Sequence, residues 1–171
     1  PQKDSETTSY PGGYVKNPHV GMHDWVMSFD LNSLYPNLIV QYNMSPETLV
    51  DSTSDANCAQ ASNGAKFTKE KKGIVPEIVE ELYIKRVTIK QEMLDAKRKL
   101  EVISKNNKHE YQQMTSQVAR LETLQTAIKI LLNSLYGAMG NKYFRYFDLR
   151  IAAGITLTGQ EVIKHAEKSV N

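Results

Sequence analysis

The spacing of apolar residues along the middle of the chain predicts two long helices. Apolar side chains recur every three or four residues, a period typical of helices with one buried face. The first pattern begins at Pro76 and carries Ile78, Val79, Leu82, Tyr83, Ile89, Met93 and Leu100. The second carries Tyr111, Met114, Val118, Leu121, Leu124, Ile128, Leu131, Leu132 and Leu135. Because a short polar segment, 104–110, separates the two, we expect an antiparallel helical hairpin.

Shorter elements are predicted before this hairpin. The segment 10–21 is rich in Pro and Gly and is expected to be a connector without regular structure. "WVMSFDL" (25–31) is apolar at most positions, as in a strand buried on both faces. Ser33 is a suitable cap for a helix over 34–42, with Pro36 tolerated in its first turn.

The remaining segments predict loops and a final helix. Residues 51–73 are small and polar, which indicates a loop or a short irregular hairpin. Gly137 and Gly140 are expected to end or bend the second long helix. "KYFRYFD" (142–148) is expected to be extended, and Asp148 to cap a helix that runs to Asn171. The fold class is α+β and mostly helical, a long antiparallel hairpin attached to a part with one or two strands and packing helices.

Composition and charge narrow the function classes only slightly. Hydrophobic residues make up 40% of the 171 residues and charged residues 23%, which is ordinary for a globular protein. The net charge is only +2, but Lys and Arg crowd between residues 66 and 108. Such a run forms either a solvated helix face or a surface that faces a polyanion.

The sequence gives little indication of a metal site or of a membrane-spanning segment. Cys58 is alone, so the sequence has neither a disulfide framework nor a cysteine zinc site. His19 and His23 lie in a loop with Pro and Gly, where we do not expect a metal site. No run of about 18 apolar residues and no signal peptide is visible, so no transmembrane helix is expected.

The end of the second predicted helix, "KILLNSLYG" (129–137), carries a row of polar side chains. Lys129, Asn133 and Tyr136 are spaced by one helical turn and share a face, next to the apolar stripe. A cation, an amide and a phenol followed by a glycine can bind a flat, anionic group. The alternative is an ordinary solvated edge of an amphipathic helix.

The first predicted helix offers a matching pair of cations. Arg86 and Lys90 are one turn apart, and Lys129 lies across the hairpin from them. Three facing cations repel one another unless an anion bridges them, which makes a polyphosphate a plausible ligand. The alternative is that these cations face solvent and pair with glutamates of the same helix.

A single carboxylate, Asp30, ends the predicted strand. Together with the free backbone amides of residues 31–35 at the start of the next helix, it can hold Mg²⁺ and triphosphate oxygens. The alternative is a structural, hydrogen-bonded aspartate.

Several ordered motifs resemble those of the family B (α-like) DNA polymerases. "DLNSLYPNLI" (30–39) is similar to motif A, and "KILLNSLYG" is similar to motif B without a mismatch. "YPGG" (10–13) resembles the connector between exonuclease and polymerase regions, and "GIVPEIVEELYIKRVTIK" (73–90) resembles the start of the fingers. "YNMSPETL" (42–49) and "YFRYFDLR" (143–150) look most like polymerases of T-even-type phages. Asn32 and Asn37 are mild departures from motif A.

The resemblance implies a division of the chain and a role for individual residues. Residues 1–24 are a connector, 25–75 and 137–171 are parts of the palm, and 76–136 is the fingers hairpin. Asp30 is implied to be catalytic and to bind a metal with the Leu31 carbonyl, in a site that uses two Mg²⁺ ions when complete. The dNTP-binding residues are implied to be Ser33, Leu34, Tyr35, Arg86, Lys90, Lys129 and Asn133. Tyr136 and Gly137 line the nascent base pair, and Tyr10, Gly12 and Gly13 contact the template. Tyr35 would also exclude a ribonucleotide 2′-hydroxyl.

The resemblance also implies a parent enzyme and its partners. The parent would be a DNA-directed DNA polymerase that adds dNMP to a primer 3′-hydroxyl and binds primer–template DNA and a dNTP, with no membrane partner. Its location would be intracellular, in the host cytoplasm for a phage protein.

One expected motif is not in the sequence. Motif C, Tyr-Gly-Asp-Thr-Asp-Ser, supplies the second catalytic aspartate in the family and is absent, as are the exonuclease carboxylates and the thumb. The chain also begins without Met, so we expect it to be a piece of a longer protein and to be inactive alone. The remainder of the polymerase would be in the same chain or in a separate subunit of a split enzyme. The other alternative is a non-catalytic helical module that binds DNA or another partner. The hairpin is shorter than expected for a T-even enzyme and fits archaeal and eukaryotic relatives better.

Overall fold

The fold is mostly helical with one small sheet. The computed structural model describes residues 10–51, 57–103 and 107–170. In chain order the elements are α1 (Leu34–Tyr42), the 3₁₀ turn η1 (Pro46–Thr48), β1 (Leu49–Val50), β2 (Cys58–Gln60), β3 (Lys66–Thr68), α2 (Ile74–Val102), α3 (Lys108–Met139) and α4 (Leu149–Val170). The predicted α+β, mostly helical class is confirmed.

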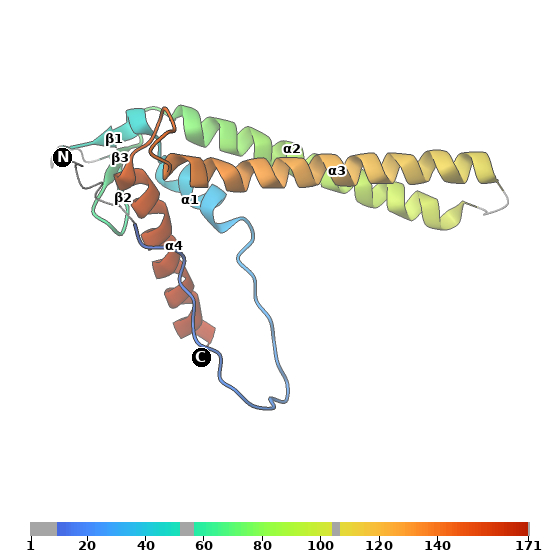
Figure 1. Ribbon diagram of the computed structural model, residues 1–171, viewed down its shortest axis with the longest axis horizontal. Coiled ribbons are helices and arrows are strands. Elements are labelled where there is room, and N and C mark those ends of the chain that lie inside the picture. Colours follow the sequence, from blue (N-terminus) through green and yellow to red (C-terminus); the bar gives the residue numbers. More distant parts are fainter. Residues whose placement is uncertain (1–9, 52–56, 104–106, 171) are drawn as a thin grey trace, which may run out of the picture.

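The two long helices form the predicted antiparallel hairpin. Figure 1 shows α2 and α3 side by side, extending away from the other elements. The N-cap of α3 is Asn107, whose side chain accepts a hydrogen bond from the backbone N–H of Glu110 at 3.5 Å. At its other end α3 continues through Gly137 and stops at Met139, with Gly140 as the C-cap. Of the two glycines expected to end the helix, Gly140 does so.

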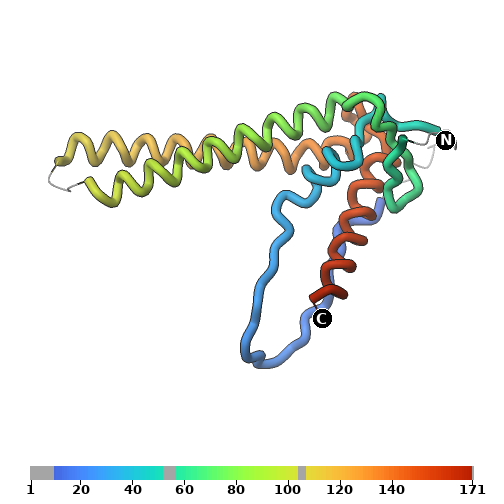
Figure 2. Tube along the Cα trace, turned by 180° about the vertical axis from the view of Figure 1, so that it is seen from behind, coloured from blue at the N-terminus to red at the C-terminus, as the bar shows by residue number. Residues whose placement is uncertain are grey.

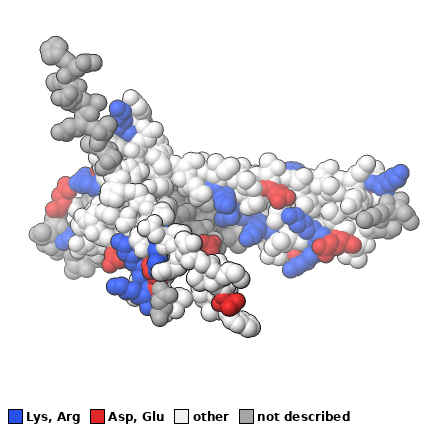
Figure 3. All heavy atoms as spheres, turned by 60° about the horizontal axis from the view of Figure 1, so that its bottom comes forward, with Lys and Arg blue, Asp and Glu red and all other residues white. Residues whose placement is uncertain are grey.

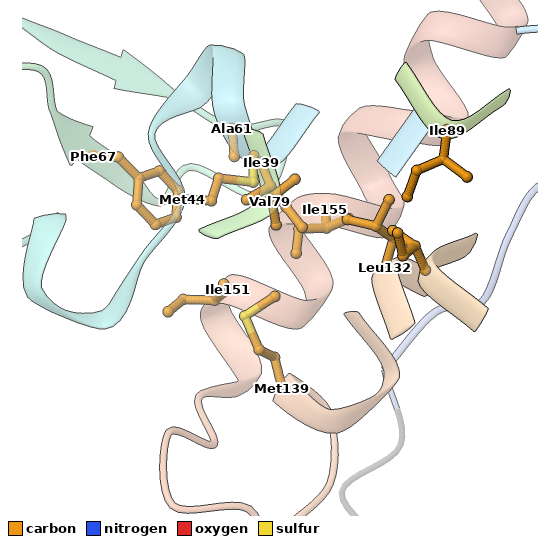
Figure 4. Packing of buried hydrophobic residues seen from close by; sticks show 11 residues of the cluster. Ile39, Met44, Ala61, Phe67, Val79, Ile89, Leu132, Met139, Ile151 and Ile155 are labelled. Carbon is orange, nitrogen blue, oxygen red and sulfur yellow. The ribbon is translucent and has the colours of Figure 1, made fainter. Parts of the chain in front are cut away.

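The hydrophobic core lies where the base of the hairpin meets α1, α4 and the sheet. Figure 4 shows Phe67 and Met44 on the sheet side, and Leu132 and Ile89 on the hairpin side. The fully buried members of this cluster come from five different elements or their connections: Ile39, Met44, Phe67, Val79, Met139, Ile151 and Ile155. The core therefore holds the base of the hairpin against α1 and α4 and leaves the far part of the hairpin outside it.

The sheet is a small three-stranded antiparallel one. The order is β1-β3-β2, and Phe67 of β3 stands between Leu49 of β1 and Ala59 of β2. The short irregular hairpin expected within 51–73 is therefore confirmed as β2 and β3. β1 was not predicted, because two residues carry no readable alternation.

The strand predicted over 25–31 is wrong. The segment has no regular structure, and its apolar side chains are exposed; Trp25 is 99% exposed and has a left-handed backbone with φ of 58°. A strand needs a neighbour for its backbone hydrogen bonds, and no described strand pairs with this one. Figure 2 shows the segment as part of a long excursion that leaves α4 and returns to α1.

Two further local predictions need correction. Ser33 occupies the N-cap position of α1 but has a left-handed backbone, φ 53°, and makes no side-chain capping bond. The segment 142–148 is turned rather than extended, since N–H groups of Phe144 and Phe147 donate to carbonyls three residues earlier. The aromatic composition of this short segment had indicated extended structure, but successive turns bury Phe144 partly against the core instead.

The predicted cap of the last helix is confirmed. The Asp148 carboxylate accepts a hydrogen bond from the backbone N–H of Arg150 at 2.8 Å and lies before the first residue of α4. The Arg150 guanidinium, hydrogen-bonded to the same carboxylate, lowers the pKa of Asp148. α4 runs to Val170, and Asn171 lies outside the described residues.

The connector before residue 17 runs along α4. The Gln160 side-chain amide donates to the Gly12 carbonyl at 2.6 Å, and Tyr14 donates to Glu167 at 3.4 Å. Lys16 pairs with the same Glu167 carboxylate. Figure 2 shows the blue tube of the connector beside the red tube of α4. The connector is thus attached to α4 through side chains at two levels of the helix.

Candidate nucleotide site

Asp30 lies just before the turn that leads into α1. The backbone reverses at Ser33, and the Asn37 side chain donates to the Asn32 carbonyl at 2.9 Å. The Asn37 backbone N–H donates to the Ser33 carbonyl at 3.0 Å as the first helical bond. Asn37, a departure from the family motif, therefore fixes this turn through its amide, which sequence reasoning missed.

Residues from both halves of the molecule surround one cavity of about 310 Å³. Asp30 and Ser33 come from the turn before α1, Arg86 from α2, and Lys129 and Asn133 from α3. The cavity is completed by Asn32, Pro36 and Leu132. The cavity is thus lined by two cations, one carboxylate, amide groups and a hydroxyl. Such a set of groups is suited to bind an anion with several oxygens.

Arg86 is the most constrained of the cavity residues. Its side chain is half-buried, and its Nε atom is buried without a hydrogen-bond partner among the described residues. A buried N–H without a partner costs about 1–3 kcal/mol. Arg86 thus lines the cavity and has one donor for which the described residues supply no acceptor.

Lys90 does not join this cluster. It lies one turn beyond Arg86 on α2, is exposed, and is not among the residues that line the cavity. Farther along the hairpin, cations form ion pairs with acidic side chains, as in Lys97–Glu122 at 3.7 Å and Arg98–Asp95 at 3.2 Å. Figure 3 shows both charges on the hairpin, so a solvated helix face describes this outer part.

Tyr35 packs beside the cavity region against a second aromatic ring. Its ring centroid lies 4.7 Å from that of Tyr136, with the planes tilted by 36°. On α4, a Cβ at Gly159 would lie 2.9 Å from the Tyr35 ring. At the connector, a Cβ at Gly13 would lie 3.2 Å from the Tyr35 hydroxyl oxygen. Four segments of the chain therefore meet at this tyrosine.

Tyr136 is a phenol held in its neutral form. Burial, followed by the neighbouring phenols of Tyr10 and Tyr35, raises its pKa. Tyr10 in turn lies where a side chain at Gly140 would be, so the connector contacts the end of α3 directly. The predicted template residues Tyr10 and Gly12 therefore lie against α3 and α4 respectively.

The other predicted residues lie around the same region but do not line the cavity. Leu31 and Leu34 face a larger, mainly apolar groove of about 770 Å³ that Asp30 also borders, between the turn and the end of α4. Gly137 is exposed on α3, and a Cβ there would meet nothing within 4 Å.

The described residues contain no group of three or more His, Cys, Asp or Glu side chains arranged to hold a metal. Asp30 is the one carboxylate that the described residues place on the cavity. A single carboxylate suits Mg²⁺ that keeps waters and binds phosphate oxygens, but not a self-contained metal centre. The exposed His23 ring nitrogen Nε2 lies 3.0 Å from the His19 carbonyl oxygen.

The whole chain, residues 1–171, matches the family model described as DNA polymerase family B. The chain therefore belongs to DNA polymerase family B. It is 33% identical to the DNA-directed DNA polymerase of Escherichia phage RB69, over 95% of this chain and 24% of that protein. It is 31% identical to the DNA-directed DNA polymerase of Enterobacteria phage T4, over 100% of this chain and 25% of that protein. These relatives confirm the predicted likeness to T-even-type phage polymerases.

Archaeal polymerases are similar to the same degree. The chain is 33% identical to a DNA polymerase of Pyrococcus glycovorans, over 95% of this chain and 19% of that protein. A solved structure of the family B DNA polymerase from Pyrobaculum calidifontis superposes with a TM-score of 0.60 at 22% identity, covering 81% of this chain and 17% of that one. The chain thus spans about a quarter of the length of its phage relatives.

Within the described ranges, every helix is too short or too polar to cross a membrane.

Proposed function

We propose that this chain forms the nucleotide-binding part of a DNA-directed DNA polymerase, which transfers dNMP from a dNTP to a primer 3′-hydroxyl. The observation that carries the proposal is the cavity that Asp30, Ser33, Arg86, Lys129 and Asn133 line together. These five residues come from three separate segments of the sequence, 30–39, 73–90 and 129–137. Family membership supports the same reaction.

Cavity residues of the α2–α3 hairpin bind the triphosphate in this proposal. Arg86 supplies a fork of N–H donors and Lys129 a mobile charge, so together they neutralise phosphate oxygens. The Asn133 amide donates beside them. Ser33, Leu34 and Tyr35 offer their backbone N–H groups at the start of α1, where a helix has unpaired donors that favour an anion. Lys90 would act from outside the cavity, as a screened charge that attracts the anion.

Mg²⁺ ions are the proposed cofactors, and when bound they neutralise phosphate charge and polarise the attacking hydroxyl. The residues present fit one side of such a site. The Asp30 carboxylate and the Leu31 carbonyl would hold a metal that also binds the triphosphate. A second carboxylate is needed for two ions, and the 171 residues contain no motif C to supply it. We therefore expect no primer extension by this chain alone; extension that Asp30→Ala abolishes would contradict this.

The aromatic residues select the sugar and the base pair. The Tyr35 ring, held by Tyr136 and Gly159, would lie under the deoxyribose and clash with a 2′-hydroxyl. Tyr136 and Gly137 would line the nascent base pair, and Tyr10, Gly12 and Gly13 would contact the template strand. The neutral phenol of Tyr136 suits a position between two stacked, uncharged surfaces.

The proposed division of the chain follows these roles. Residues 1–24 form the connector, 25–75 and 137–171 belong to the palm, and 76–136 are the fingers. Primer–template DNA, a dNTP and the rest of the polymerase, in the same chain or in another subunit, are the proposed partners. A replicative role places the protein inside cells, in the host cytoplasm if it comes from a phage.

Equilibrium binding of a dNTP with Mg²⁺ tests the proposal. Lys129→Ala removes a cavity cation and is expected to weaken binding by about tenfold, the effect of one charge-assisted hydrogen bond. Lys108→Ala is the matched control, since Lys108 begins the same helix at the far end of the hairpin. Equal dNTP binding by the unsubstituted chain and by the Lys129→Ala variant would contradict the proposal. Retained synthesis by the longer polymerase carrying Lys129→Ala or Asp30→Asn would favour the non-catalytic helical module instead.

A further inference from the structure

Asn43 occupies an unusual position immediately after α1. It is buried, with 6% of its surface exposed, and has a left-handed backbone with φ of 57°. Its side-chain amide donates to the carbonyls of Thr68 and Lys71 at 2.6 and 2.8 Å, and its amide oxygen accepts from the Gly73 N–H at 2.8 Å. All three bonds reach the segment that runs from the end of β3 to the start of α2.

The end of α1 does not itself require this amide. α1 is closed by backbone bonds, from the Met44 N–H to the Ile39 carbonyl at 2.9 Å and from the Asn43 N–H to the Val40 carbonyl at 3.3 Å. A left-handed residue at this place is usually glycine, which would make the same backbone bonds. The side chain of Asn43 therefore serves the connection to α2 and not the termination of α1.

The neighbouring residues make the same connection from a second side. The Glu47 carboxylate accepts a hydrogen bond from the Ile74 N–H, the first residue of α2, and the Ser45 hydroxyl accepts from the Val75 N–H at 3.4 Å. Backbone and side chains approach so closely that a Cβ at Gly73 would lie 2.6 Å from the Cβ of Ser45. We call residues 43–48 with Gly73 the junction.

The junction stands between the two sides of the cavity. Asp30 and Ser33 lie just before α1, whereas Arg86 lies on α2, whose first residue follows Gly73. Within the described residues, the hairpin meets the other elements at the start of α2 and the end of α3. The direction in which α2 leaves the junction therefore sets where Arg86 lies relative to Asp30.

We propose that Asn43 is a positioning residue that fixes the direction of the α2–α3 hairpin relative to α1 and thereby holds the two sides of the cavity together. Its effect on nucleotides rests on the proposed function, whereas its effect on the hairpin does not. Three hydrogen bonds between one buried amide and the backbone of Thr68, Lys71 and Gly73 restrain rotation as well as distance, because the donors and acceptors of the amide are coplanar. Asn43 would touch neither nucleotide nor metal.

The first experiment measures the direction of the hairpin in the chain itself. Nitroxide labels at the exposed residues Gln41 and Glu101, in a Cys58→Ser background, report the distance between α1 and the far part of α2 by pulsed electron paramagnetic resonance. Asn43→Gly keeps the left-handed backbone and loses the amide. We expect a broader or displaced distance distribution. An unchanged distribution would overturn the proposal.

A control and a second variant separate positioning from general stability. Asn63→Ala removes another amide that binds a backbone carbonyl, that of Arg150 at 2.7 Å, away from the hairpin; its distribution is expected to match the parent. Asn43→Asp preserves the shape but places a carboxylate oxygen against the Thr68 and Lys71 carbonyls. It is measured if Asn43→Gly does not fold, and an unchanged distribution for Asn43→Asp would equally overturn the proposal.

The second experiment measures kinetics in the longer polymerase that contains this chain. Asn43→Gly is expected to raise the KM for dNTP about tenfold, which is the equivalent of one or two lost hydrogen bonds. The kcat should stay within about threefold of that of the unsubstituted polymerase. A fall in kcat with KM unchanged would overturn the nucleotide part of the inference. A displaced hairpin with both constants unchanged would leave the positioning intact and contradict the proposed role of Arg86.

Discussion

Replacing Arg86 by Met is predicted to have opposite effects on stability and on nucleotide binding. The substitution removes the guanidinium and keeps an unbranched apolar side chain of similar length at this half-buried position. Because the Arg86 Nε is buried without a partner among the described residues, its removal relieves a cost instead of breaking a bond. Buried charged groups replaced by apolar ones of similar size often leave a protein equally or more stable.

The magnitudes follow from this one unpaired donor. A buried N–H without a partner costs about 1–3 kcal/mol, and part of that is offset by packing lost with the guanidinium. We expect the free energy of unfolding of the nucleotide-free chain to rise by about 1 kcal/mol. A hydrogen bond to a charged acceptor contributes about 1.5–3 kcal/mol, so dNTP binding should weaken by about 10- to 150-fold.

The assay combines urea unfolding, followed by circular dichroism, with titration of dNTP in the presence of Mg²⁺. Lys90→Met is the matched control, since Lys90 is a cation on the same helix that is exposed and does not line the cavity. Its unfolding free energy should stay within about 0.5 kcal/mol of the parent, and its binding should weaken by no more than about fivefold. Loss of stability in Arg86→Met, or equal weakening in both variants, would refute the reasoning.

Three further predictions concern the core, the aromatic cluster and pH. Phe67→Ala empties the centre of the core and should lower the unfolding free energy by about 3–5 kcal/mol in urea, whereas Tyr143→Ala, at a site 85% exposed, should leave it nearly unchanged. Gly159→Ala brings a Cβ to 2.9 Å from the Tyr35 ring, so the ratio of kcat/KM for dNTP over rNTP in the longer polymerase should change several-fold; an unchanged ratio would contradict the sugar-selecting role. For Glu47, burial raises the carboxyl pKa, but hydrogen bonds from Ser45 and from the Ile74 N–H outweigh it and lower the pKa below 4.5. The unfolded chain therefore binds the proton more readily, so stability is present above about pH 4.5 and falls at lower pH; Glu47→Gln should flatten this fall in urea titrations between pH 6 and 3.

The hairpin was predictable from sequence because its burial pattern is local and long. Apolar residues repeat with the helical period over about seven turns in each helix, and a polar break separates them. The same periodicity placed Lys129 and Asn133 on one face, and both line the cavity. Lys90, one turn beyond Arg86 on α2, does not line this cavity, because the spacing of cations on one helix does not show how far the neighbouring elements extend along it.

The elements that depend on distant partners were harder to predict. Residues 25–31 have the composition of a buried strand, but no described segment pairs with them, so they remain without regular structure. β1 has two residues and exists because Phe67 and its neighbours pair with it. The three hydrogen bonds of Asn43 join residues 25–30 positions apart and leave no periodic signal. The sequence had shown only that "YNMSPETL" resembles the family.

The part of the hairpin beyond Leu121, toward its tip, lies outside both the core cluster and the cavity. Arg86 lies twelve residues after the start of α2, so at 1.5 Å per residue about 24 Å of α2 extends beyond it to Val102. Chain lengthening beyond Val102 would cost little loop-closure free energy and would leave the cavity residues where they are. The tip between α2 and α3 is therefore a natural place to graft a fluorescent reporter or a second domain onto the protein.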